Sequence, residues 1–98
     1  MPIRPQKTRP PGRPKGSRSF DASIAKSFGA VMRSTRLAAG ISQEHLAHTA
    51  DIERSYIGRI ERGQSQPTLH ALLKIALALD CEVADLVAPV EVNWRSRG

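Results

Sequence analysis

The chain has 98 residues, of which 40% are apolar and only 4% aromatic, and it carries a formal net charge of +6. A chain this short forms one small domain with a modest core, which excludes a large enzyme with a deep cleft. Its single cysteine excludes a disulfide framework and favours a reducing cytoplasm, and no run approaches the roughly 20 apolar residues of a membrane helix.

Residues 1–20 are predicted to form a disordered, basic tail. They contain six of the fifteen lysines and arginines, no acidic residue and five of the seven prolines. The rest of the chain carries nine basic and nine acidic side chains, so the whole net charge lies in this tail. Such a segment buries too little apolar surface to offset the entropy that it would lose on ordering.

Within the tail, the segment PGRPKGS resembles the core of an AT-hook, in which an extended Arg-Pro segment lies along the minor groove of A·T-rich DNA. The match is incomplete, because Pro11 stands where the hook has a second arginine. A generic basic arm that contacts phosphates without reading sequence is therefore an equal alternative. In either case the expected DNA contacts are Arg9, Arg13, Lys15 and Arg18.

Residues 21–88 are predicted to form an all-α, compact five-helix bundle. The first helix begins after the N-cap Asp21 and stops at Gly40, and Ser42 caps a short second helix. The inward residues of that second helix are expected to be Leu46, Ala47 and Ala50.

The third predicted helix lies within DIERSYIGRIERG, which begins at Asp51. Its isoleucines form one buried stripe, whereas its other face carries Arg54, Ser55, Gly58 and Arg59. A fourth helix, TLHALLKIALAL, is apolar at so many positions that we expect it to be the central helix of the bundle. A short turn from Val83 to Val87 is expected to close the core.

The second and third helices, at about residues 42–62, form a helix-turn-helix pattern, in which the second helix of the motif lies in the major groove of DNA. The sequence from about Phe28 to Val87 closely resembles the phage-repressor-like family of bacterial regulators, often called Cro or Xre type. The most specific segments are SQEHLA, SYIGRIERG and PTLHALLKIA. The resemblance implies a lambda-repressor-like DNA-binding domain.

The resemblance also implies roles for individual residues. Base edges are expected to be read by Arg54, Ser55, Gly58 and Arg59, and phosphates to be contacted by Ser42, Gln43, Tyr56 and Gln66. Arginine suits guanine and serine pairs with several bases, whereas the alternative is a merely solvated helix face. Arg36 and Glu61 are expected to form a structural, partly buried ion pair.

Two residues depart from the family's pattern. Asp51 stands where relatives have a glycine in the turn, and aspartate tolerates the left-handed conformation that the turn needs. Glu53 opens the reading helix, where it either repels nearby phosphates or accepts a hydrogen bond from a cytosine amino group.

Residues 89–98 are predicted to form a C-terminal tail. The segment VEVNWR alternates apolar with polar residues, which is typical of a short strand, and an isolated strand needs a partner such as a second copy of the chain. A tail whose tryptophan folds back on the core is the alternative. A homodimer is expected because helix-turn-helix proteins usually read two half-sites. The candidate dimer contacts are Val83, Leu86, Val87, Val90, Val92 and Trp94.

These observations favour a sequence-specific DNA-binding transcriptional regulator, more often a repressor, that binds a palindromic operator as a homodimer in the bacterial cytoplasm. The alternatives are an antitoxin that also represses its own operon, and a nucleoid-type architectural protein. No catalytic motif appears, so we expect neither an enzyme nor a cofactor. We also expect no metal site, because the spacing of His45, His48, His70 and Cys81 is irregular.

Overall fold

The computed structural model describes residues 20–96, which form five helices and contain no strand. The predicted tail contacts at Arg9, Arg13, Lys15 and Arg18 lie outside the described residues. The expectation of an all-α bundle of five helices is confirmed. The helices are α1 (Ala22–Ala38), α2 (Gln43–Ala50), α3 (Arg54–Glu61), α4 (Leu69–Ala78) and α5 (Val83–Ser96).

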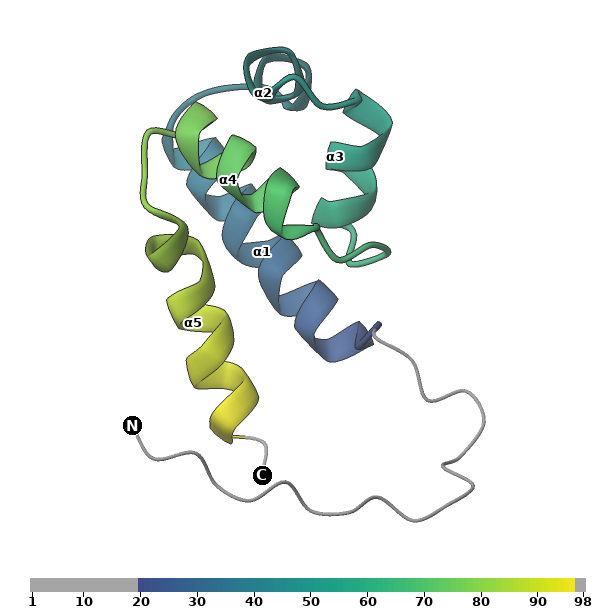
Figure 1. Cartoon of the computed structure of the whole chain (residues 1–98), viewed down its shortest axis with the longest axis vertical. Coiled ribbons are helices and arrows are strands. Elements are labelled where there is room, and N and C mark those ends of the chain that lie inside the picture. The colour runs from purple at the N-terminus through teal and green to yellow at the C-terminus, as the bar shows by residue number, and fades with distance from the viewer. Residues whose placement is uncertain (1–19, 97–98) are drawn as a thin grey trace.

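The long helix α1 takes the central place in the bundle (Figure 1). It packs against α3 on one side and against α5 on the other, while α2 packs against both α3 and α4. The prediction that α4 is the central helix is wrong, because one side of α4 faces away from the core and leaves Leu69, Leu73 and Leu77 exposed.

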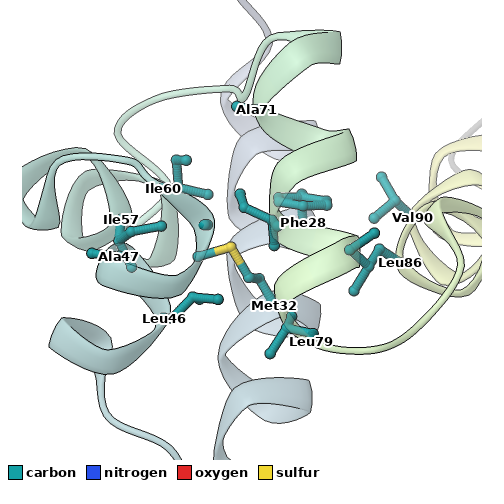
Figure 2. Packing of buried hydrophobic residues seen from close by; sticks show 13 residues of the cluster. Phe28, Met32, Leu46, Ala47, Ile57, Ile60, Ala71, Leu79, Leu86 and Val90 are labelled. Carbon is teal, nitrogen blue, oxygen red and sulfur yellow. The ribbon is translucent and has the colours of Figure 1, made fainter.

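Phe28 and Met32 of α1 stand in the middle of the core (Figure 2). Side chains of α2 and α3 lie to one side of them, and Leu86 and Val90 of α5 lie to the other. Burying a large aliphatic side chain contributes about 1.5–3 kcal/mol, so these contacts fix the position of α3 relative to α1. The largest fully buried side chains are Met32, Leu46, Ile57, Ile60, Ile75 and Leu86.

Side-chain caps define where three of the helices begin. Asp21 Oδ1 accepts hydrogen bonds from the backbone N–H groups of Ser23 and Ile24, at 2.9 and 3.1 Å. Ser42 Oγ accepts one from His45 at 3.0 Å, and Thr68 caps α4 in the same way. Each such cap contributes about 1 kcal/mol. The predicted caps at Asp21 and Ser42 are confirmed.

The turn between α2 and α3 has the left-handed geometry that the sequence indicated. Asp51 adopts φ 57° and ψ 52°, and the N–H of Ile52 donates to the carbonyl of Ala47 at 2.9 Å. Aspartate tolerates this conformation better than most residues. Gly40, which follows α1, also has a positive φ of 73°.

The predicted C-terminal strand is wrong, because α5 continues through Pro89 as far as Ser96. Val90 lies one helical turn after Leu86, so a helix buries both side chains against the core, whereas an isolated strand would leave its backbone groups unpaired. This gain outweighs the one helical hydrogen bond that Pro89 cannot donate. The helical domain therefore extends to residue 96 instead of ending at residue 88.

Candidate nucleic-acid interface

The helix α3 is strongly two-sided. Ile57 and Ile60 have no exposed surface and point into the core, whereas Arg54, Ser55 and Arg59 are exposed on the other side. The core contacts hold the helix firmly while they leave its polar side accessible. The helix therefore presents its polar side to solvent or to a partner.

Arg59 is held over an aromatic ring on the same helix. Its guanidinium carbon lies 5.6 Å from the centroid of Tyr56, which is within cation–π distance. The Tyr56 hydroxyl donates to the carbonyl of Gln66 at 3.4 Å and accepts from the N–H of Thr68 at 3.3 Å. The loop between α3 and α4 thereby fixes the ring, and the ring in turn limits the directions that Arg59 can take.

Arg36 and Glu61 form the ion pair that the resemblance implied. Arg36 Nε donates to Glu61 Oε2 at 2.6 Å and Nη2 to Oε1 at 2.9 Å, and both side chains are more than nine-tenths buried. Arg36 Nη1 also donates to the carbonyl of Ile41, and Gln43 Nε2 donates to Glu61 Oε1 at 3.0 Å. The network joins α1, the start of α2 and the end of α3.

The same contacts shift both pKa values in the direction that keeps the pair charged. The pKa of Arg36 is raised, mainly by its hydrogen bonds to Glu61. Burial by itself would raise the pKa of Glu61, but hydrogen bonds from Arg36 and Gln43 outweigh burial and lower it. The pair is therefore ionised in the folded protein at neutral pH.

The four predicted phosphate contacts have different surroundings. Ser42 is exposed beside its capping bond, whereas Gln43 and Tyr56 are half-buried and already bonded within the protein. Gln66 Oε1 accepts a hydrogen bond from the N–H of Asp21, which ties the loop after α3 to the start of α1. Contact with phosphate stays a prediction for all four residues.

Gly58 lies on the polar side of α3 with Arg54 and Ser55 but is covered by another side chain, so base reading by Gly58 stays a prediction. The glycine is buried, because the side chain of Arg62 folds back over it with Nη1 3.1 Å from where a Cβ would stand. Arg62 is one helical turn after Gly58 and is itself exposed. The four-residue spacing between the two is the sequence signal that indicates this contact.

The candidate dimer contacts divide into two groups. Leu86 and Val90 belong to the core and are not available to a partner, whereas Val92 and Trp94 are exposed at the end of α5. Val83 and Val87 are half-buried. The sequence interpretation missed the exposed leucines of α4, at positions 69, 73 and 77, whose spacing of four places them on one side of the helix.

Three other features of residues 20–96 bear on function. No three of their histidines, cysteines and carboxylates lie together in a way that would hold a metal ion, and His45, His48 and His70 are exposed. Burial raises the pKa of the Cys81 thiol, and neighbouring carboxylates add to the shift. None of the five helices is long and apolar enough to cross a membrane.

Comparison with known proteins gives consistent matches. Residues 32–86 match the model of a helix-turn-helix family. The control protein C.BamHI of Bacillus amyloliquefaciens is 41% identical over 61 residues, which cover 61% of this chain and 75% of that protein.

Two solved structures share the fold. The restriction-modification controller protein C.AhdI of Aeromonas hydrophila is 45% identical with a TM-score of 0.62, and the match covers 63% of this chain and 94% of that one. The clp gene regulator ClgR of C. glutamicum is 26% identical with a TM-score of 0.66, over 71% and 91% of the two chains.

Proposed function

Because this chain belongs to the helix-turn-helix family of DNA-binding transcriptional regulators, we propose that it reads its operator with Arg54, Ser55 and Arg59 of α3. The observation that carries the proposal is the two-sided α3, with Ile57 and Ile60 held in the core and Arg59 steadied on Tyr56. A recognition helix places its N-terminal residues at base edges, and arginine grips guanine with two parallel hydrogen bonds. Glu53 makes no side-chain capping bond at the start of α3, so its carboxylate is available to a cytosine amino group.

We further propose that the protein controls genes of a restriction-modification system and represses its own promoter. The support is the likeness to proteins named as controllers, of which C.AhdI is a restriction-modification controller. The same names favour regulation over the antitoxin and architectural alternatives. The site of action would be the DNA of the bacterial cytoplasm. The tail residues Arg9, Arg13, Lys15 and Arg18 would add phosphate or minor-groove contacts beside the operator.

The operator is proposed to be palindromic and the protein a homodimer. Leu69, Leu73 and Leu77 form a stripe along α4, with exposed fractions of 69%, 53% and 81%. A stripe of large apolar side chains on so small a domain marks an interaction surface. Helix-turn-helix proteins read two half-sites about 34 Å apart, which requires two copies related by a two-fold axis. We therefore assign the exposed surface of α4 to contact with a second copy of the chain.

A reporter gene driven by the promoter upstream of this chain's own gene tests the regulatory proposal. Supplying the protein should lower reporter expression, and the Arg54→Ala, Arg59→Ala double variant should restore it. Reporter expression that is the same with the protein, with the double variant and with neither would contradict the proposal.

A further inference from the structure

We propose that Arg62 is a phosphate contact of this protein, and that α3 holds its guanidinium in place through Gly58 and Gln64. The inference rests on the proposed binding of DNA by α3, and it adds a residue and a positioning device to that surface. Arg62 ends the reading helix, where it has φ −85° and ψ 0°.

The side chain of Arg62 lies back along α3 across Gly58. Its Nη1 is 3.1 Å from the Cβ position of residue 58, and its Cζ and Nη2 are both 3.8 Å from it. A methyl group at position 58 would therefore require the guanidinium, which ends an exposed side chain, to move by a few tenths of an ångström. A glycine inside a helix costs stability relative to alanine, and here it leaves the space in which Arg62 lies.

Gln64 fixes the guanidinium from the other end. Arg62 Nε donates to Gln64 Oε1 at 3.1 Å, and this is a hydrogen bond between two exposed side chains. A guanidinium has five N–H donors, so the four on its two terminal nitrogens stay available for a ligand. Neither of the two ion pairs found within residues 20–96 involves Arg62.

The surroundings of Arg62 favour an anionic partner. Lys26 and Arg33 of α1 line the same hollow as Arg62, between α1 and the end of α3. Glu61 is the one acidic residue among those that line it, and its carboxylate is already engaged by Arg36 and Gln43. The hollow therefore presents positive charge without a carboxylate free to neutralise it.

The place of Arg62 on the helix indicates phosphate and not a base edge. Ser55 and Arg59 lie seven and three residues before it, so all three share one side of a helix with a period of about 3.6 residues. A recognition helix directs its N-terminal residues at the bases, which leaves its C-terminal end nearer to the sugar-phosphate backbone. A planar guanidinium binds phosphate oxygens through two parallel hydrogen bonds.

The test compares the wild-type protein with Arg62→Ala, Arg62→Lys and Gly58→Ala on an operator selected from a random pool of duplexes and on a scrambled duplex, over a range of salt concentrations. Arg62→Ala should weaken binding to both duplexes by about tenfold, and the slope of log affinity against log salt should fall by about 0.9 for each phosphate that the variant no longer neutralises. Arg62→Lys should keep the slope and lose only part of the affinity. Gly58→Ala should raise the midpoint of thermal unfolding and weaken binding to both duplexes by less than Arg62→Ala does.

Arg95→Ala is the matched control, because Arg95 is an exposed arginine paired with Glu91 at the far end of α5. Its affinity and salt slope should equal those of the wild type. Loss on the operator alone would show Arg62 to be a base contact, and no loss on either duplex would show that it is not a DNA contact, so either result overturns the inference. A wild-type protein that prefers no sequence would instead contradict the proposed function itself.

Discussion

The guanidinium of Arg59 lies over the ring of Tyr56, with 5.6 Å between its central carbon and the ring centroid. Because the Tyr56 hydroxyl bonds to the backbone of Gln66 and Thr68, the ring cannot swing away from α3 without breaking those bonds. Under the proposal that Arg59 binds a base edge, it would therefore lose less side-chain freedom on binding than an unsupported arginine would.

Replacing Arg59 by alanine should weaken binding to the specific operator by about 1–3 kcal/mol and relax the base preference at the position that it reads. Titrations of the variant on the operator and on a scrambled duplex measure the difference directly. An equal loss on the two duplexes would mean that Arg59 contacts only phosphate.

Replacing Glu61 by glutamine should destabilise the fold by about 3–5 kcal/mol, because it leaves Arg36 charged and buried without its carboxylate partner. Urea unfolding followed by circular dichroism gives this free energy. The control is Glu91→Gln, which breaks an exposed pair on α5 and should change the free energy of unfolding by less than about 1 kcal/mol. Similar changes in the free energy of unfolding for Glu61→Gln and Glu91→Gln would contradict the structural role of the Arg36–Glu61 pair.

The same pair should make the fold sensitive to acid. The pKa of Glu61 in the folded protein lies below its ordinary value of 4.5, so the folded state binds this proton less readily than the unfolded state does. The stabilisation is therefore complete above pH 4.5 and is lost as the pH falls through the lower, folded pKa. Unfolding measured from pH 7 to pH 3 should show this loss in the wild type and a smaller one in Glu61→Gln.

The local sequence was sufficient to predict where α1 and α2 begin and where the turn between α2 and α3 lies. The caps at Asp21 and Ser42 and the left-handed Asp51 follow from the properties of single residues and their immediate neighbours. Features that depend on how the helices pack were predicted less well. The alternation in VEVNWR resembled a strand, but burial of Val90 one turn after Leu86 decided in favour of a helix.

Gly58 illustrates the same limit within the candidate site. A glycine inside a helix often marks the close approach of another group, and the sequence interpretation placed Gly58 on the side that faces DNA. In the structure the group is the side chain of Arg62 from the same helix. Only the path of a long side chain distinguishes these two explanations, and a residue pattern does not contain that information.

Deleting residues 1–18, which carry six positive charges, should reduce the salt dependence of DNA binding by several units, at about 0.9 for each phosphate that the tail neutralises. The midpoint of thermal unfolding should not change. If the segment PGRPKGS acts as an AT-hook, the deletion should also remove any preference for A·T-rich flanks. An unchanged salt slope would show that the tail does not contact DNA.

Changing Leu73 and Leu77 together to glutamate should convert the proposed dimer into a monomer, because two charges would be buried against the partner's α4. Sedimentation at micromolar concentration measures the mass. The comparison variant carries Val92→Glu and Trp94→Glu, which are exposed at the end of α5, and it should stay dimeric. A monomer only in the comparison variant would place the interface on α5 instead.

Selection of bound duplexes from a random pool by the full chain tests the central claim most directly. The account predicts one enriched sequence with two-fold symmetry and half-sites about one helical turn apart, roughly 34 Å between centres. Repeating the selection with Arg59→Ala should lose the base preference at a single symmetric pair of positions. Recovery of no preferred sequence, or of a single site without symmetry, would contradict the claim that this protein reads a palindromic operator with two copies of α3.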